Sequence, residues 1–186
     1  ATLSTILYLG STQGVSYAGL TTGEDELELK DEFNILSGDP FSVKGEELRL
    51  DGRLYEGTGS DRFGVRDTGS LISIRTERDS PQLKALLRSF GVKDSQAIKL
   101  VSALKDYIDR DSLVSLNGAE KTDYEYRGLL QPTNRFLVSP TQIENVLGWK
   151  EVFGKEIYRL MEEVTIYNGN KPNFNTLSKR GMRVLG

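Results

Sequence analysis

Residues 103–126, ALKDYIDRDSLVSLNGAEKTDYEY, contain the most informative pattern of the chain. The stretch begins as the end of an amphipathic helix, because apolar residues recur there at intervals of three and four. These apolar residues are Ile98, Val101, Leu104 and Ile108. A loop follows the helix, and the acidic residues of the helix end and the loop are Asp106, Asp109, Asp111, Glu120 and Asp123.

Carboxylates at the C-terminal end of a helix meet the negative end of the helix dipole, where cations are favoured. No dense run of Lys or Arg stands beside them. A hard cation such as calcium, which binds carboxylate and carbonyl oxygens, would offset the repulsion between these carboxylates and the negative end of the helix dipole. The spacing is not that of an EF-hand, although Asp109, Asp111 and Glu120 would take its positions 1, 3 and 12. Leu113 and Val114 stand where that loop requires an oxygen ligand and a glycine.

The acidic loop has two interpretations. A loop of another shape could bring Asp109, Asp111, Glu120 and Asp123 around one calcium ion, with backbone carbonyls completing the shell. Alternatively, these carboxylates cap helices and remain in water, which is the commoner role of an isolated acidic loop. The residues alone leave both interpretations open.

The composition limits the possible functions. The chain has 186 residues, of which 37% are hydrophobic and 27% charged, as is typical of one or two soluble domains. A net charge of -3 gives no general electrostatic reason to bind nucleic acid or an anionic membrane. The chain has neither His nor Cys, which excludes histidine-based triads, disulfides and thiol nucleophiles. No apolar run reaches the ~20 residues that a membrane helix needs.

The part of the chain before residue 78 favours β-structure. Asp51 and Gly52 lie between two β-prone runs, and this dipeptide predicts a hairpin. We expect an antiparallel sheet over residues 46–74, ending in a strand over 70–74.

After residue 78 the hydrophobic period changes from two to 3.6. Ser80 and Pro81 predict the start of a helix, and Gly91 predicts its end. A second helix capped by Asp94 or Ser95 completes a helical hairpin over 80–111. Further helices are expected after Ser139-Pro140 and over residues 151–163 and 178–185.

Several segments resemble the K-type minor pseudopilins of type II secretion systems. The central ones are LVSALKDYIDRD at 100–111 and NGAEKTDYEY at 117–126. The other segments, in the order of that family, are DGRLYEG, VRDTGSLISI, LKALLRSFGV, PTNRFLVSPTQIENVLGW and PNFNTLSKRGMRVL. The resemblance covers residues 48–186. Two positions depart from it: DTGSLISIR replaces a block closer to DEGGLINLN, and Lys121 stands where the family often has an acidic residue.

The resemblance implies an α+β fold in which a pilin-like antiparallel sheet carries a large inserted α-helical domain with helix-hairpin-helix-like elements. We expect a β-rich part over 1–78, the inserted helical domain over 79–165, and a return segment with a terminal helix over 166–186. The resemblance also implies that a membrane anchor precedes Ala1 and that the family's last strands follow Gly186.

The resemblance further implies a structural role and no enzymatic activity. A K-type protein would sit at the tip of a pseudopilus in the periplasm of a Gram-negative bacterium, anchored in the inner membrane. There it would assemble with the I-type and J-type minor pseudopilins and support protein export. The family binds calcium in its helical domain, so the implied ligands here are Asp109, Asp111, Glu120 and Asp123.

Two alternatives come from other classes. The segments around Gly148 and over 175–186 resemble DNA-binding helix-hairpin-helix elements, and the second is basic at Lys171, Lys179, Arg180 and Arg183. Against this, the chain is acidic overall, and Glu151 stands where a phosphate would need a donor or a cation. An enzyme could use Asp106 and Asp109 as paired carboxylates, although nothing nearby resembles a substrate site.

Overall fold

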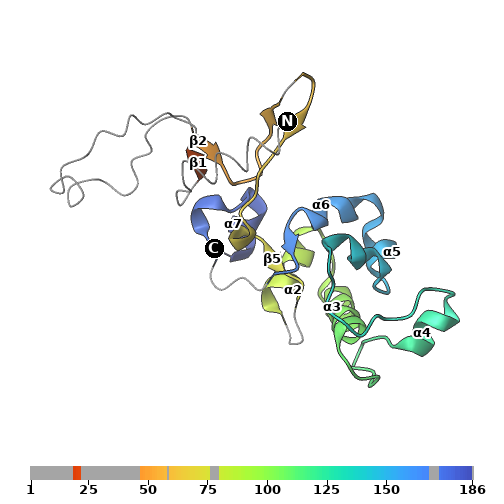
Figure 1. The fold of residues 1–186 in the computed structure, drawn as a ribbon. Coiled ribbons are helices and arrows are strands. Elements are labelled where there is room, and N and C mark those ends of the chain that lie inside the picture. The colour runs from red at the N-terminus through yellow and green to blue at the C-terminus, as the bar shows by residue number, and fades with distance from the viewer. Residues whose placement is uncertain (1–18, 22–46, 58, 76–79, 168–171, 186) are drawn as a thin grey trace, which may run out of the picture. The chain divides into compact units, whose positions relative to one another are not determined.

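The computed structural model describes residues 19–21, 47–57, 59–75, 80–167 and 172–185 (Figure 1). The chain divides into two compact units, and each is described by itself. The first unit combines the chain up to Ser70 with Asn173–Ser178, and the second combines Leu71–Pro172 with the chain from Lys179 onward. Mixed helices and small sheets confirm the α+β class. The division at 1–78, 79–165 and 166–186 stays a prediction.

Two short antiparallel pairs form the described strands of the first unit. Strand β1 (Gly19–Thr21) pairs with β2 (Glu47–Arg49), and β3 (Tyr55–Glu56) pairs with β4 (Arg62–Phe63). The 3-10 helices η2 (Thr68–Ser70) and η5 (Phe174–Thr176) pack against each other.

The hairpin predicted at Asp51-Gly52 is wrong. Gly52 does adopt a positive φ of 81°, as a turn residue should, but the strands on either side of it do not pair with each other. The ring of Tyr55 stacks on Phe63 at 5.8 Å, so β3 pairs forward across the loop that follows it. Aromatic cross-strand contacts of this kind outweigh a local turn signal.

Asp67 joins two distant segments of the first unit. Its carboxylate accepts hydrogen bonds from the backbone N–H of Gly69 at 2.8 Å, the side-chain amide of Asn173 at 2.8 Å and the hydroxyl of Thr176 at 3.0 Å. Burial raises the pKa of the Asp67 carboxyl, but these three hydrogen bonds outweigh it, so the pKa is lower than its usual 3.8.

We expect Asp67→Ala to lower the free energy of unfolding by roughly 1–3 kcal/mol, because three donors lose their acceptor. Urea unfolding measures the loss, with the exposed Asp61→Ala as the control. Because the folded-state pKa is lowered, the stabilisation is present above the unfolded-state pKa and is lost as the pH falls through the folded-state pKa. The two proteins should therefore converge in stability below pH 3.8, and a loss that stayed constant there would contradict the assignment.

The second unit places helices between two strands that pair in parallel. Strand β5 (Ile72–Ser73) pairs with β6 (Val164–Thr165), about ninety residues further along the chain. The strand predicted over 70–74 is reduced to Ile72–Ser73, because Ser70 ends the 3-10 helix η2, and it pairs in parallel with β6 instead of joining an antiparallel sheet with the strands before it. Between β5 and β6 lie α2 (Pro81–Ser89), α3 (Asp94–Ile108), α4 (Lys121–Tyr126), η3 (Pro140–Asn145), α5 (Trp149–Phe153), η4 (Gly154–Glu156) and α6 (Ile157–Met161).

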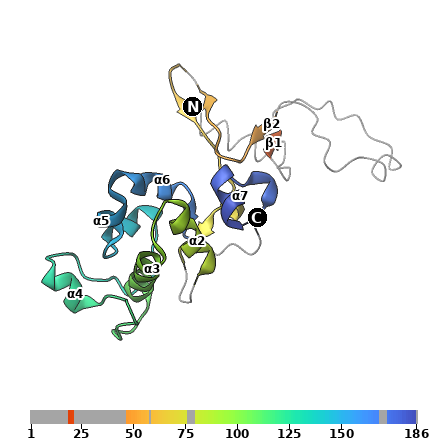
Figure 2. The ribbon, with the colours of Figure 1, turned by 180° about the vertical axis from the view of Figure 1, so that it is seen from behind.

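The helical hairpin over 80–111 is confirmed as α2 and α3. The Ser80 hydroxyl accepts a hydrogen bond from Leu83 N–H at 3.2 Å, and Pro81 takes the first helical position. Gly91, which has a φ of 85°, follows α2 and ends the first helix of the hairpin. Helix α3 begins at Asp94, with Lys93 in the capping position that was predicted for Asp94 or Ser95. In both views of the ribbon, α4 lies on the far side of α3 from α2 (Figure 1, Figure 2).

Two later helix predictions need correction. Ser139-Pro140 starts a 3-10 helix instead of an α-helix, with the Ser139 hydroxyl accepting from Thr141 N–H at 3.3 Å. The helix predicted over 151–163 is divided into α5, η4 and α6, because Gly154 adopts a φ of 50° that an α-helix does not accommodate. The terminal helix is confirmed as α7 (Lys179–Leu185), which packs on α2.

The core of the second unit is formed by one cluster of buried side chains from its helices and from β5 and β6. Trp149 lies within it with no exposed surface, and its indole N–H donates a hydrogen bond to the carbonyl of Leu100 at 3.0 Å. Ile98 belongs to the apolar pattern that the sequence predicts, yet it is 41% exposed. Its outward position shows that the apolar face of α3 is wider than the core it contacts.

Candidate metal centre

Asp106 lies in the last turn of α3 and has no exposed surface. One carboxylate oxygen, Oδ2, accepts a hydrogen bond from the backbone N–H of Ser115 at 2.9 Å. The other oxygen, Oδ1, has no hydrogen-bond partner. Burial of a carboxylate oxygen without a donor is costly, so a positive partner at this atom would be stabilising.

Glu120 brings a second buried carboxylate to the same region. Its side chain is 5% exposed, and its Oε1 has no hydrogen-bond partner. Burial raises the pKa of the Glu120 carboxyl, and the negative charges of Asp109, Asp106 and Asp111 raise it further. Four carboxylates therefore act on one another at the junction between α3, the acidic loop and α4.

The four predicted ligands have different surroundings. Asp109 caps the C-terminus of α3, and its N–H donates to the carbonyl of Lys105 at 3.0 Å. Asp111 accepts from Leu113 N–H at 2.9 Å. Asp123 is exposed, and its Oδ2 accepts from Glu120 N–H at 3.0 Å, so one of its oxygens serves as a helix cap.

Asp106, which the sequence did not select as a ligand, is a further carboxylate of this region, and its charge acts on Glu120. A signal for it existed, because Asp106 follows the buried Ala103 by three positions and so lies on the same face of α3. Among the described residues, no group of three or more Asp, Glu, His or Cys forms a ready-made metal cluster. The pair that an enzyme would use, Asp106 and Asp109, includes one side chain with no solvent exposure.

Gly118 lets the acidic loop approach α3 closely. A Cβ atom at this position would overlap Oδ2 of Asp106, so only glycine fits here without moving the carboxylate. The preceding Asn117 has a φ of 68°, a left-handed conformation that Asn tolerates better than most residues. The loop therefore brings backbone and carboxylate into direct contact around Asp106.

Tyr124 connects this region to the core. Its side chain has no exposed surface, and its hydroxyl oxygen accepts a hydrogen bond from Leu147 N–H at 2.9 Å. Its ring lies 5.9 Å from that of Tyr107, on the last turn of α3. Burial raises the pKa of the Tyr124 hydroxyl, which therefore stays protonated. Helix α4, which begins directly after Glu120, is thus fixed to the core.

We expect Tyr124→Phe to lower the free energy of unfolding by about 1–3 kcal/mol, because Leu147 N–H is left without its buried acceptor. Urea unfolding followed by circular dichroism measures this loss. The matched control is Tyr126→Phe, since that side chain is 93% exposed and should change stability little. Equal effects of the two substitutions would contradict the role of the Tyr124 hydroxyl.

The comparison with known proteins identifies the family. The family model described as "Type II secretion system (T2SS), protein K" matches residues 65–168, which is more than half of the chain and includes the whole acidic region. The chain therefore belongs to the type II secretion system protein K family, a component of a secretion system.

One curated protein and one solved structure are similar to this chain. The "Type II secretion system protein K" of Aeromonas hydrophila is 38% identical over 69 residues, which is 35% of this chain and 20% of that protein. The crystal structure of the GspK-GspI-GspJ complex from enterotoxigenic Escherichia coli contains a chain with a TM-score of 0.55 and 22% identity. That match covers 64% of this chain and 46% of the other, so this chain spans less than half the length of either relative and shares the second one's fold.

In the part of the chain that the structure describes, no helix is long and apolar enough to cross a membrane. The comparisons give no support for the DNA-binding alternative. In the structure, Arg180 of the basic tail contacts α2: its guanidinium lies 3.6 Å from the ring centre of Phe90 and donates to the carbonyl of Ser89 at 3.1 Å. Lys171 lies outside the described residues.

Proposed function

We propose that this chain is part of a structural minor pseudopilin that assembles with the I-type and J-type minor pseudopilins at the tip of a type II secretion pseudopilus. The observation that carries the proposal is the family match over residues 65–168. The fold shared with a chain of the GspK-GspI-GspJ complex supports it. The protein would act through its surfaces and support protein export without catalysing a reaction.

The proposed location follows from the same role. A protein that joins a pseudopilus tip would lie in the periplasm of a Gram-negative bacterium, held in the inner membrane by an N-terminal anchor helix. The second unit suits an insertion, because the helices from α2 to α6 lie between two strands that pair with each other, β5 and β6. A pilin-like sheet formed by the remaining part would contact the other pseudopilins.

Reconstitution tests the proposal. Purified chain is mixed with the soluble parts of the I-type and J-type proteins from the same secretion system, and the mixture is analysed by size-exclusion chromatography with light scattering. We expect one species whose mass is the sum of the three components. Separate elution of this chain beside an I–J complex would contradict the proposal.

We propose further that the acidic region binds calcium. Of the four predicted ligands, Asp109, Asp111 and Glu120 would hold the ion together with Asp106 and backbone carbonyls of the loop. Asp123 is left out of this set because its Oδ2 caps α4 by accepting from Glu120 N–H. The support is twofold: Asp106 and Glu120 each have a buried carboxylate oxygen without a hydrogen-bond partner, and burial together with the neighbouring carboxylates raises the pKa of Glu120. The ion would supply positive charge and a cross-link between the end of α3 and the start of α4.

Isothermal titration calorimetry tests this part separately. We expect wild-type protein to bind calcium and Asp109→Ala to bind it at least tenfold more weakly. Asp61→Ala removes an exposed carboxylate of the first unit and should bind calcium like the wild type. If Asp109→Ala and Asp61→Ala gave equal titration curves, any bound calcium would lie outside the acidic region.

A further inference from the structure

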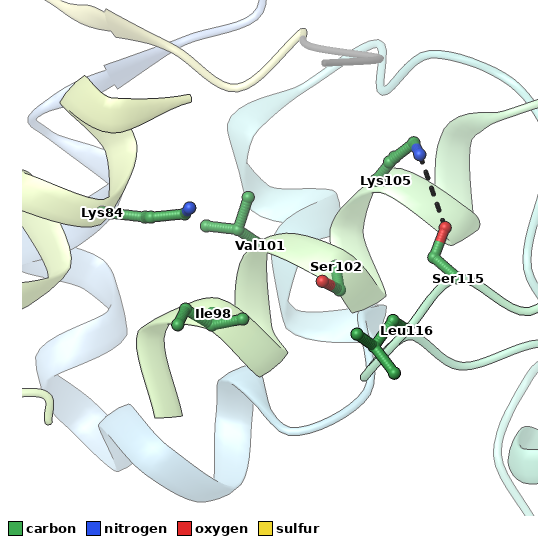
Figure 3. A pocket seen from close by; sticks show the side chains of 7 residues that line it. All are labelled: Lys84, Ile98, Val101, Ser102, Lys105, Ser115 and Leu116. Carbon is green, nitrogen blue, oxygen red and sulfur yellow. Dashed lines mark hydrogen bonds between the residues drawn. The ribbon is translucent and has the colours of Figure 1, made fainter. Parts of the chain in front are cut away.

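A groove of about 330 Å³ runs beside α3 in the second unit (Figure 3). One wall is a single face of α3, where side chains follow one another at intervals of three and four. The other side is formed by the acidic loop and by α2. The lining residues are Lys84, Ile98, Val101, Ser102, Lys105, Ser115 and Leu116.

Apolar side chains gather at this groove without being covered. Leu116 is 89% exposed and Ile98 is 41% exposed, and both line it. Leu113 and Val114, on the same loop, are 76% and 60% exposed. Single exposed apolar residues are ordinary, but three within four consecutive positions, beside an apolar groove, mark a surface for interaction.

The groove is held open by fixed contacts. Ser115 N–H donates to the buried carboxylate of Asp106 at 2.9 Å, which fixes the backbone of the loop against α3. The ammonium of Lys105 contacts the Ser115 hydroxyl at 3.4 Å, as the dashed line in Figure 3 shows. The side chain of Leu116 is therefore presented next to Ser102 on a loop whose position is already set. Preformed surfaces of this kind bind with a smaller loss of entropy.

The charged side chains that line the groove indicate which kind of partner it would bind. Its lining carries two lysines, Lys84 and Lys105, and no carboxylate, in a chain whose net charge is -3. We propose that the groove docks an amphipathic helix of a partner protein, with apolar side chains facing Ile98 and Leu116 and carboxylates facing the two lysines. A helix is favoured because the groove runs along α3 and has no strand edge in its lining.

An anionic membrane surface is the competing occupant, because lysines beside apolar side chains also attract lipid. The concave form of the site and the negative net charge of the chain favour a protein helix instead. This inference goes beyond the proposed function. A variant that no longer binds a helix in the groove should still assemble with the I-type and J-type proteins, so a failure of the groove proposal can be distinguished from a failure of the proposed function.

The probe is a labelled 18-residue helical peptide with leucines on one face and glutamates on the other, and its binding is followed by fluorescence anisotropy. We expect Leu116→Ser to weaken binding at least tenfold. Leu130→Ser, which changes a residue of similar exposure (78%) outside the groove lining, should leave binding unchanged.

A charge exchange completes the test. The double substitution Lys84→Glu and Lys105→Glu should weaken binding of the glutamate peptide and strengthen binding of a matched peptide that carries lysines instead. Thermal melts verify that each variant folds. Equal effects of Leu116→Ser and Leu130→Ser, or binding that does not respond to the charge exchange, would overturn the proposal. It would also be overturned if the chain bound phosphatidylglycerol vesicles and not the peptide.

Discussion

Trp149→Ala is expected to remove about 3–5 kcal/mol from the free energy of unfolding of the helical unit. Trp149 has no exposed surface, and its ring stacks on Phe153 at a centroid distance of 6.0 Å. The substitution leaves a large cavity and deprives the carbonyl of Leu100 of the indole N–H. Since domains are stable by only ~5–15 kcal/mol, such a loss is a large fraction of the total.

Circular dichroism in a urea titration measures this effect, because Trp149 is the chain's single tryptophan and its fluorescence disappears with it. Trp149→Phe serves as the matched variant: it keeps an aromatic ring, loses the N–H donor and should cost less. Tyr126→Ala, at an exposed aromatic position, should stay within about 0.5 kcal/mol of the wild type. A Trp149→Ala loss no larger than that of Tyr126→Ala would show that the core is not arranged as described.

Glu120→Gln is expected to have opposite effects with and without calcium. Burial and three neighbouring carboxylates raise the folded-state pKa of Glu120 above its usual 4.5, so the carboxylate form is unfavourable when no cation is present. In chelator at neutral pH, the variant should therefore be more stable than the wild type. With calcium at a hundred times its Kd, the wild type gains ~2.7 kcal/mol that the variant gains only in part.

The pH dependence gives the same prediction a second readout. A carboxyl whose pKa is raised on folding binds more protons in the folded state than in the unfolded state. Wild-type stability in chelator should therefore fall as the pH rises from 4.5 through the folded-state pKa, and the Glu120→Gln profile should be flatter there. Denaturant unfolding at a series of pH values measures both curves. Parallel curves, or a variant that is less stable than the wild type in chelator, would contradict the assignment.

Local signals predicted the local structure well. Ser80, Pro81 and Gly91 fixed the first helix because caps and left-handed glycines act through their immediate neighbours. Strand partners could not be predicted in this way: β5 pairs with β6 about ninety residues away, and nothing near Asp51-Gly52 indicates that β3 pairs forward through Tyr55 and Phe63. Pairing between strands depends on tertiary contacts that sequence periodicity does not contain.

The acidic region was located from the sequence, but its internal arrangement was not. Helix periodicity placed Asp106 on a turn, whereas its complete burial depends on Ser115 and Gly118 folding back onto it. The capping role of Asp123 required the start of α4, which the sequence analysis did not predict. The exposure of Ile98 likewise depends on how much of α3 its neighbours cover.

A thermal melt in excess calcium, excess magnesium and chelator tests most directly whether a cation braces this helical unit. Trp149 fluorescence follows the unit that contains the acidic region. With calcium at a hundred times its Kd, the account predicts a gain of ~2.7 kcal/mol and a shift of about 5–11 °C. Magnesium should shift the melt much less, because it requires near-ideal octahedral geometry and retains its waters. Identical melts in all three conditions would contradict the account and leave the carboxylates as a calcium-free acidic loop.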